Sequence, residues 1–442
     1  MTRILCVVFF FLLFSSAEAG YLDLAWDPNN ESDLAGYRVY FGIVSNQYAE
    51  FVDVGNRTTY RLGDLTEGVR YYVAVSAYDN AGRESEYSEE VSGIPSQVSP
   101  GPVEELVVGL GSYPAQGGWV ETCSEPNVHG DWIRVGWDAY NAANGETRVA
   151  AGDIDGDGTN EVVVGLGPVS GNSAVPGGWF EVFDGDGTHL AWGRVNWSPY
   201  NAANGETWPA CGDLDGDGRD EIIIGLGSGG AGWVEVFDYA GGRITHNHWK
   251  HINWSPYNAA NGETRPACGD LDGDGKDEII IGFGPVAGET SLPGGWIQVM
   301  DDDAVQWGRV GWSGYNDSNG ETRPACGDID GDGKDEIIVG LGPGGAGWVE
   351  LFDVLPTGLS RKNWVRVNWK AYNTPSGETR PASGDIDGDG KDEIVAGLGP
   401  EGKGYLEVLD DASSNYAHLS WPRVSWSTYN TANGESWPGV KR

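Results

Sequence analysis

Five copies of one acidic loop carry the strongest chemical signal in the sequence. Each copy reads Asp-x-Asp-Gly-Asp-Gly-x-x-Glu, and the copies begin at Asp153, Asp213, Asp270, Asp328 and Asp385. Carboxylates at alternate positions, with glycines that let the backbone curl, gather hard oxygen ligands around one point. Ca²⁺ accepts six to eight such ligands, whereas Mg²⁺ retains waters and resists an all-protein cage. The sequence therefore predicts about five Ca²⁺ sites.

The predicted ligands of each loop are three Asp carboxylates, the backbone carbonyl of the seventh residue and the carboxylate of the ninth. They are Asp153, Asp155, Asp157, Thr159, Glu161, Asp213, Asp215, Asp217, Arg219, Glu221, Asp270, Asp272, Asp274, Lys276, Glu278, Asp328, Asp330, Asp332, Lys334, Glu336, Asp385, Asp387, Asp389, Lys391 and Glu393. An EF-hand would place a Glu at the twelfth position and continue as a helix. Here that position is apolar, as at Val164, so we expect a calcium loop in a β-hairpin. A solvated acidic turn is the alternative, and five matching copies argue against it.

A second recurring string, Trp-x-x-Tyr-Asn-x-x-Asn-Gly-Glu-Thr, offers a different chemistry. Its tryptophans are Trp137, Trp197, Trp254, Trp312, Trp369 and Trp426. One hypothesis is a sugar site in each repeat, with Trp faces stacking on the sugar and Asn and Glu binding hydroxyls. The other is packing between neighbouring repeats, with Asn and Gly making a turn, and presence in every copy favours it. A third set is expected in the core: Trp119, Trp179, Trp233, Trp296, Trp348 and Tyr405.

Catalytic motifs are missing from the sequence. Neither Gly-x-Ser-x-Gly nor His-Glu-x-x-His occurs, and the single His cluster comprises His246, His248 and His251. A catalytic acid or base should break the symmetry of the repeat, and none does. We therefore predict a binding or adhesion protein that is not an enzyme. The alternative is a carbohydrate-active enzyme, such as a polysaccharide lyase or hydrolase on a calcium propeller.

The elements that must position these residues repeat every 57–60 residues from Val103 onward, with four strand-like segments per unit. The first unit starts at Glu104–Gly111, which matches a second strand, and the chain finishes at Asn433–Pro438, which matches the entry to a first strand. These missing halves complement each other. The sequence thus predicts an all-β fold with a six-bladed β-propeller over residues 103–442, closed by its own C-terminus.

The acidic loops and the strands that follow them resemble the FG-GAP repeats of integrin α-subunit propellers and their bacterial relatives, also known as VCBS-type repeats. That resemblance implies calcium binding and extracellular adhesion or ligand binding. Two departures concern loop geometry and blade number. The ninth loop position holds Glu, as at Glu161, where the family usually has Asp, and the predicted six blades contrast with seven in integrins.

Residues 20–95 follow different rules, with period-2 strands separated by turns. Trp26, the segment Gly36–Tyr40 and the spacing Leu65-x-x-Gly68-x-x-Tyr71 resemble a fibronectin type III domain, which implies a small β-sandwich without an activity of its own. Residues 96–102 are rich in Pro and Ser and are predicted to be a short linker.

Composition limits the partners and the compartment. The net charge of −39 argues against nucleic acid. Residues 1–19 have the charge, apolar run and small-x-small end of a secretory signal, and no other stretch is long and apolar enough to cross a membrane. The sequence predicts a secreted or cell-surface protein that binds an extracellular glycan or protein. Beyond Cys6, the residues Cys123, Cys211, Cys268 and Cys326 replace small or apolar repeat residues and are expected to be structural thiols.

One position of the repeat differs between copies, although it holds neither a carboxylate nor a histidine in any of them. It holds Arg148, Arg265, Arg323 and Arg380 in four copies, but Trp208 and Trp437 in the other two. If exposed, these side chains form an aromatic and cationic platform for acidic glycans or carboxylate-bearing peptides. If they pair with neighbours such as Glu206, they line the central channel instead.

Overall fold

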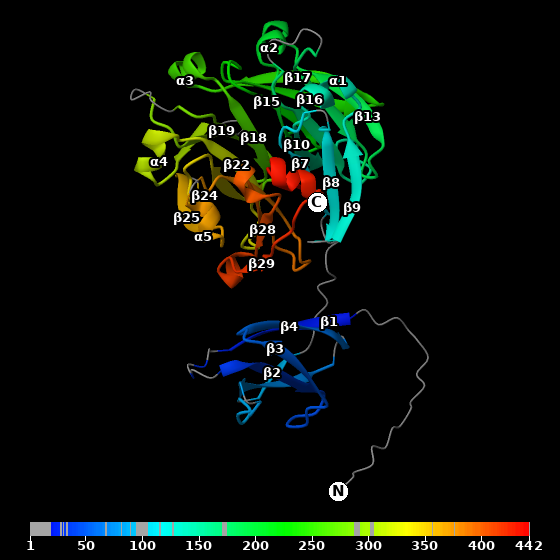
Figure 1. Cartoon of the computed structure of the whole chain (residues 1–442), viewed down its shortest axis with the longest axis vertical. Coiled ribbons are helices and arrows are strands. Elements are labelled where there is room, and N and C mark those ends of the chain that lie inside the picture. Colours follow the sequence, from blue (N-terminus) through cyan, green and yellow to red (C-terminus); the bar gives the residue numbers. More distant parts are fainter. Residues whose placement is uncertain are drawn as a thin grey trace. The chain divides into compact units, whose positions relative to one another are not determined.

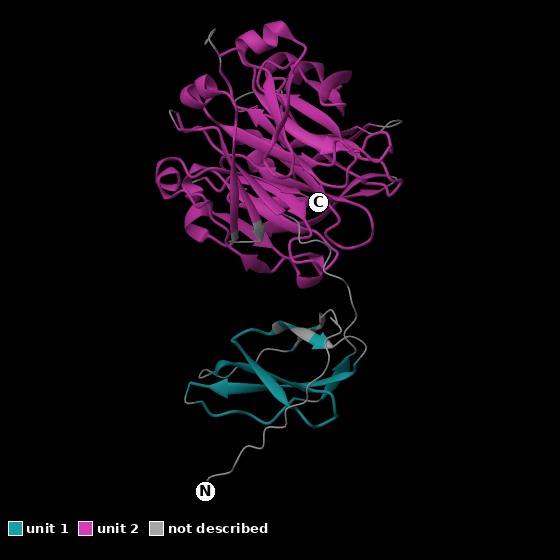
Figure 2. Ribbon diagram, turned by 90° about the vertical axis from the view of Figure 1, so that its right-hand side faces the viewer, with its two compact units in different colours: residues 1–100 teal, residues 101–442 magenta. Residues whose placement is uncertain are grey.

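The computed structural model divides into two compact units, residues 1–100 and 101–442 (Figure 2). It describes residues 19–441 apart from 27–28, 30, 32–33, 67–68, 81, 89, 94–104, 115, 126–127, 170–174, 287–291, 301–304, 356 and 375. The predicted signal segment up to residue 18 and the predicted linker 96–102 lie outside the described residues. No helix among the described residues is long and apolar enough to cross a membrane. Over the described residues the fold is all-β, as predicted, with seven four-stranded antiparallel sheets and few helices.

The first unit contains a two-stranded sheet, β1-β4, and a four-stranded sheet in the order β3-β2-β5-β6. The strands are β1 (Ala19–Ala25), β2 (Leu34–Gly42), β3 (Glu50–Gly55), β4 (Thr59–Thr66), β5 (Tyr71–Asp79) and β6 (Val91–Gly93). Alternation in β2 and β5 buries Tyr37, Val39 and Val73 against Leu62 of β4. Trp26 packs edge-on against Tyr37, with ring centroids 5.6 Å apart. The two sheets therefore share one apolar core.

The second unit contains six four-stranded antiparallel sheets. Their strands, in sheet order, are β30 (Ser436–Lys441), β7 (Glu105–Leu110), β8 (Trp119–Glu125) and β9 (Val128–Arg134); β10 (Thr147–Gly152), β11 (Glu161–Leu166), β12 (Trp179–Phe183) and β13 (His189–Arg194); β14 (Thr207–Gly212), β15 (Glu221–Leu226), β16 (Trp233–Ala240) and β17 (Arg243–His251); β18 (Thr264–Gly269), β19 (Glu278–Phe283), β20 (Trp296–Met300) and β21 (Val305–Arg309); β22 (Thr322–Gly327), β23 (Glu336–Leu341), β24 (Trp348–Leu355) and β25 (Gly358–Arg366); and β26 (Thr379–Gly384), β27 (Glu393–Leu398), β28 (Leu406–Leu409) and β29 (His418–Ser420).

The residue types explain which strands lie inside each sheet of the second unit and which lie at its edge. Every residue of β11, β15, β19, β23 and β27 is buried, as their runs of Val and Ile require when both faces of a strand are covered. The strand before each of these is an edge strand. Prolines such as Pro266 in β18 are tolerated there because an edge strand has N–H groups outside the ladder.

A threonine or serine hydroxyl of each first strand bonds its sheet to the neighbouring sheet. Thr147 of β10 donates to the backbone of Trp119 and accepts from the N–H of Leu110 at 2.8 Å. The same acceptor role recurs at Thr207, Thr264, Thr322, Thr379 and Ser436. Ser436 belongs to β30, which pairs with β7 in the register Ser436↔Leu110. The last strand of the chain therefore completes the sheet of the first repeat.

A short helix follows the fourth strand of each sheet, where the sequence predicts a turn. The helices are α1 (Asp138–Ala143), α2 (Ser198–Ala203), α3 (Ser255–Ala260), α4 (Ser313–Ser318), α5 (Lys370–Asn373) and α6 (Ser427–Ala432), with 3₁₀ turns η1 (Pro400–Gly402) and η2 (Ala412–Ser414). Figure 1 shows α2 to α5 at the outer edge of the strands. The Tyr-Asn pair locks each helix: Tyr140 accepts from Gly167 N–H at 2.7 Å, and Asn141 donates to the carbonyl of Val135 at 2.8 Å. These two residues are therefore architectural.

The cysteines are packed, as expected of structural thiols. Cys123 and Cys326 are buried, and Cys123, Cys211 and Cys268 are in no disulfide. Burial raises the pKa of the Cys123 thiol to about 12. A thiol with so high a pKa is protonated and unreactive at neutral pH.

Candidate functional site

The acidic loops connect the first and second strands of five sheets, and backbone bonds shape them. In the first loop Asp153 accepts from the N–H groups of Gly156, Asp157 and Gly158 at 2.8–3.0 Å. Gly156 and Gly158 have φ of +78° and +89°, a conformation that favours glycine. The four other loops repeat this pattern around Asp213, Asp270, Asp328 and Asp385. One glycine-dependent turn therefore recurs five times.

The turn brings predicted ligands together. Carboxylate oxygens lie within 4.8 Å of one another in the sets Asp153, Asp155 and Glu161; Asp213, Asp215 and Asp217; Asp270, Asp272 and Glu278; Asp328, Asp330 and Asp332; and Asp385, Asp387 and Glu393. The seventh residues, predicted to ligate through their carbonyls, lie in the same turns: the backbone N–H groups of Thr159, Lys276, Lys334 and Lys391 donate to the fifth-position Asp. The side chain of Arg219 lies against Gly156 of the preceding loop.

The electrostatics of the loops fit a divalent cation. Burial, together with the neighbouring Asp carboxylates, raises the pKa of Glu161 to about 7 and that of Glu393 to about 9. Burial raises the pKa of Glu221 to about 7 as well. Clustered carboxylates repel one another unless a cation offsets them. The donor set, all hard oxygens on a flexible loop, is the one Ca²⁺ prefers.

The loops are bonded to one another in series. The N–H of Asp220 donates to the carbonyl of Asp153 at 2.9 Å, and that of Asp277 donates to Asp213 at 2.8 Å. Equivalent bonds join Asp335 to Asp270 and Asp392 to Asp328. Neighbouring loops therefore form a continuous rim.

A second candidate site lies between neighbouring sheets, where groups of three aromatic side chains pack against the core and, at two places, line a cleft. We call these groups the aromatic clefts. They comprise Trp119, Trp132 and Trp426; Trp137, Trp179 and Trp192; Trp197, Trp233 and Trp249; Trp254, Trp296 and Trp307; Trp312, Trp348 and Trp364; and Trp369, Tyr405 and Trp421. All are only partly buried, so the expectation that Trp119 and its equivalents lie in the core was wrong.

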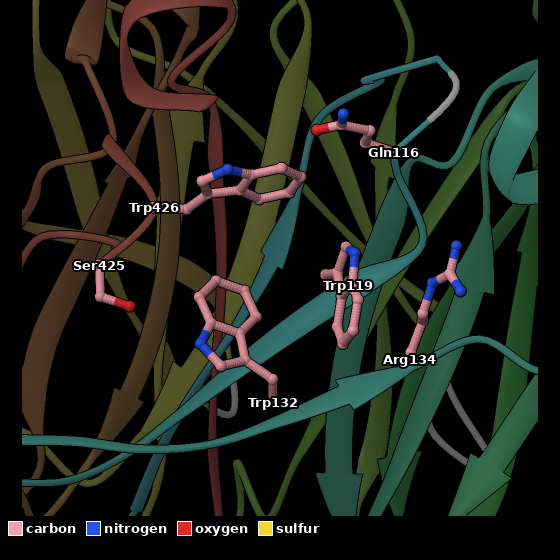
Figure 3. A pocket seen from close by; sticks show the side chains of 6 residues that line it. All are labelled: Gln116, Trp119, Trp132, Arg134, Ser425 and Trp426. Carbon is pink, nitrogen blue, oxygen red and sulfur yellow. The ribbon is translucent and has the colours of Figure 1, made fainter. Parts of the chain in front are cut away.

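One of these clefts is lined by residues from both ends of the second unit. Gln116, Trp119, Trp132 and Arg134 line it together with Ser425 and Trp426, and its volume is about 610 Å³ (Figure 3). The rings of Trp119 and Trp132 meet edge to face at 6.0 Å, while the guanidinium of Arg134 lies 5.1 Å from the Trp119 ring on its other side. A second cleft, lined by Asn196, Trp197, Trp233 and Trp249, has about 320 Å³. Both present aromatic faces beside hydrogen-bonding groups.

Four buried glutamates each pair with a histidine, a feature that the sequence patterns did not predict. The pairs are Glu121–His129 at 3.0 Å, Glu181–His189 at 2.8 Å, Glu235–His246 at 2.9 Å and Glu407–His418 at 3.0 Å. Burial raises the pKa of Glu181, Glu235 and Glu407. The signal was a Glu two residues after the third-strand aromatic residue and a His three residues before the fourth-strand Trp, as in Glu235 and His246.

The second pocket connects to one of these pairs. Asn196 lines the cleft and donates from its side chain to Glu235 at 2.7 Å, and Glu235 in turn contacts His246. The ring of His246 lies 6.1 Å from that of Trp249, and about a third of this side chain is exposed. Asn196, Glu235 and His246 therefore form a chain of polar contacts beside the aromatic rings, which we call the polar relay.

The predicted aromatic and cationic platform is not exposed, which corrects that hypothesis. Arg148, Arg265, Arg323, Arg380 and Trp208 are all less than 10% exposed, and Trp437, the sixth member, is half-buried. Each Arg bridges two Glu of the Asn-Gly-Glu-Thr strings, as Arg323 does between Glu321 and Glu378. Together these residues line a cavity of about 90 Å³ among the first strands. Burial in a ring of carboxylates makes the Arg residues structural counter-ions, because an unpaired buried charge is costly.

Two family comparisons agree with the sequence. Residues 12–94 match the fibronectin type III domain family, and residues 213–281 match the FG-GAP-like repeat family. The chain thus carries a fibronectin type III domain followed by an FG-GAP-like repeat, as predicted. No match was found among curated proteins.

The solved structures similar to this chain include three rhamnogalacturonan lyases. The exotype lyase YesX has a TM-score of 0.32 and 16% identity over 92% of this chain and 73% of its own. The lyase YesW has a TM-score of 0.32 and 16% identity over 87% of this chain and 88% of its own. The Bacillus licheniformis lyase PL11 has a TM-score of 0.25 and 16% identity over 89% of this chain and 65% of its own.

These neighbours contradict the prediction that the protein is not an enzyme. That prediction took the absence of known catalytic motifs as a reason to exclude an enzyme. All three neighbours are lyases. The Glu–His pairs also contain side chains that can accept and donate protons, although they belong to no familiar catalytic motif. At such TM-scores the likeness transfers no activity to this chain.

Proposed function

We propose that the protein is an exported, calcium-stabilised protein that binds extracellular polysaccharide chains in its aromatic clefts. The observation that carries the proposal is the group of three partly exposed aromatic side chains that recurs between successive sheets and that, at two places, lines a cleft next to polar side chains. Flat aromatic rings stack on the apolar faces of sugars, while Asn, Gln and Arg bind hydroxyl and carboxylate groups. Several equivalent clefts on one chain would also give avidity for a repeating polymer.

The clefts require a particular arrangement of the sheets, and we propose that residues 101–442 form a closed six-bladed propeller. Three links between the two ends of the unit support closure. Strand β30 pairs with β7, the N–H of Ser425 donates to Glu121 at 2.9 Å, and Asn433 donates to the carbonyl of Ser112 at 2.9 Å. Contacts between successive first strands, including β26 with β30 and β30 with β10, support it as well.

Calcium in this proposal is structural. The loops lie between first and second strands, whereas the aromatic clefts are built from third and fourth strands and from residues at the helix starts. Bound Ca²⁺ would neutralise the clustered carboxylates and hold the loop rim. The Asp and Glu side chains supply the ligands, and the loop glycines allow them to converge.

The test is a saccharide panel measured by calorimetry at fixed calcium, with short oligosaccharides so that sites can be counted. Trp132→Ala and Trp249→Ala should each remove one site per chain. Phe51→Ala, which removes an exposed aromatic residue of the first unit, should leave the count unchanged. If no saccharide binds the wild-type protein, or if both tryptophan variants bind like it, the clefts are not sugar sites.

A second candidate function is polysaccharide cleavage by β-elimination, and the relay Asn196–Glu235–His246 favours it. In this reaction a base such as the His246 imidazole takes the proton next to a uronate carboxylate. The electron pair forms a C=C bond, the bond to the bridging oxygen breaks, and an acid protonates that oxygen. The assay follows the ultraviolet absorbance of unsaturated sugar ends in uronate polymers. No absorbance increase from the wild-type protein would reject cleavage, and an unchanged rate in His246→Ala would exclude His246 as the base.

A further inference from the structure

One lysine side chain enters the fourth acidic loop. Lys362 lies in β25, and its ammonium contacts Asp330 at 2.5 Å, Glu336 at 2.8 Å and Asp353 at 2.9 Å. Asp330 and Glu336 are two of the predicted metal ligands of this loop. The Lys362 side chain is 21% exposed, and Glu336 is 5% exposed. An ammonium group has three N–H donors, and here each faces a carboxylate.

The copies compared below have no lysine at this position of the fourth strand. Lys362 occupies a bulge in β25, between Asn363, which pairs with Leu351, and Arg361, which pairs with Phe352. The same bulge position holds Leu190 in β13, Asn247 in β17 and Leu419 just before the Trp421 of the last repeat. In β20–β21 no bulge occurs, because Met300 pairs directly with Val305. Of these positions, the one beside the fourth loop is basic.

The surroundings of Lys362 keep it charged. A lysine ammonium has an ordinary pKa of about 10.4, well above neutral pH, and three carboxylates lie within 2.9 Å of this one. Lys362 is therefore a permanent positive charge at neutral pH. A Ca²⁺ ion held by Asp330 and Glu336 would lie within a few ångströms of that charge and would compete for the same oxygens.

We propose that the ammonium of Lys362 takes the place of the metal ion in the fourth loop, so that the chain binds four Ca²⁺ ions and not five. The inference rests on the calcium sites proposed above. It differs from them in treating one loop as internally neutralised: its carboxylates are balanced by the protein itself, whatever the calcium concentration. The fourth loop would then stay ordered when calcium is withdrawn, while the other loops lose their counter-ions.

The experiment counts Ca²⁺ per chain by calorimetric titration of the metal-free, full-length protein. The wild type should bind four ions, and Lys362→Leu, which copies the residue at position 190, should bind five. Lys370→Leu, which removes an exposed lysine at the start of α5, is the matched control and should bind four. Glu278→Gln, which alters a predicted ligand of the third loop, should bind three ions. This result would show that the counted ions are bound by the loops.

Thermal unfolding supplies a second readout. In chelator, Lys362→Leu should melt below the wild type, because Asp330, Glu336 and Asp353 lose their cation. Saturating calcium should restore part of that loss in the variant. Five ions in the wild type, or an unchanged count in Lys362→Leu, would overturn the inference and leave the calcium sites intact. Absence of any calcium binding in wild type and variants would instead overturn both.

Discussion

The phenol of Tyr429 accepts a hydrogen bond from the backbone N–H of Gly111 at 2.7 Å, although 318 positions separate the two residues. The same hydroxyl donates to the carbonyl of Glu435, which lies just before β30. Within the chain the equivalent bond joins Tyr257 to Gly284 at 2.8 Å, across only 27 positions. The contact that joins neighbouring repeats therefore also joins the last repeat to the first.

Removing this hydroxyl should weaken the second unit. Tyr429→Phe leaves the buried N–H of Gly111 without its acceptor, and an unsatisfied buried donor costs about 1–3 kcal/mol. We expect a loss of this size in the free energy of unfolding, measured by denaturant titration. Tyr257→Phe is the matched control, because it breaks the same bond inside the chain. A Tyr429→Phe variant as stable as the wild type would mean that the two ends are not held by this contact.

Deleting residues 433–442 should have a larger effect. The deletion removes β30, so β7 becomes an exposed edge strand and the hydroxyl link from Ser436 to Leu398 is lost. We expect a marked fall in melting temperature and concentration-dependent association, measured by calorimetry and light scattering. Truncation at residue 441 serves as the control. A ten-residue deletion that melts like the full chain and stays monomeric would refute closure by the C-terminal strand.

Stability should depend on the ionisation of Glu350. Burial raises the pKa of this carboxyl from an ordinary 4.5 to about 7. Between pH 4.5 and about pH 7 the folded protein therefore keeps the proton on Glu350, whereas the unfolded chain releases it. The contribution of Glu350 to the free energy of unfolding consequently falls as the pH rises through this window. The expected loss is on the order of 2–3 kcal/mol.

The chain provides its own variant for testing this titration. Gln298 pairs with Trp307 as Glu350 pairs with Trp364, and there a neutral amide occupies the equivalent place. Glu350→Gln should keep the bond from Gly311 N–H and remove this part of the pH dependence. Denaturant titrations at pH 5 and pH 8 measure the difference. An identical pH slope in variant and wild type would show that Glu350 does not titrate in this window.

Calcium should stabilise the second unit through binding linkage. Each occupied site adds about 2.7 kcal/mol at a free calcium concentration one hundred times Kd. Chelation should therefore lower the melting temperature, and Asp272→Ala should lower the number of bound ions by one. Replacing Asp138, an exposed residue at the start of α1, is the control. Equal melting temperatures in chelator and in calcium would show that the loops are not structural calcium sites.

Local patterns determined much of this protein in advance. The spacing of carboxylates and glycines predicted which side chains would converge at Asp153 and its equivalents, because a turn of nine residues is a local structure. The repeat period and the Val- and Ile-rich runs such as β19 predicted the sheets, because burial of both faces demands them. The complementary ends around Glu105 and Ser436 predicted the pairing of β30 with β7, because each end of the second unit lacks the strands that the other end supplies.

Tertiary structure decided what lies between the repeats. Whether Trp119 is buried or lines a cleft depends on the distance between two sheets, and no single repeat contains that distance. Arg265 and Trp208 were ambiguous in sequence because their partners, Glu321 and Arg148, belong to other repeats. The Glu235–His246 pair and the entry of Lys362 into the fourth loop depend on a β-bulge that shifts the strand register by one residue. Because a one-residue shift exchanges the faces of a strand, the side chain that meets the buried carboxylate is decided only when the sheet forms.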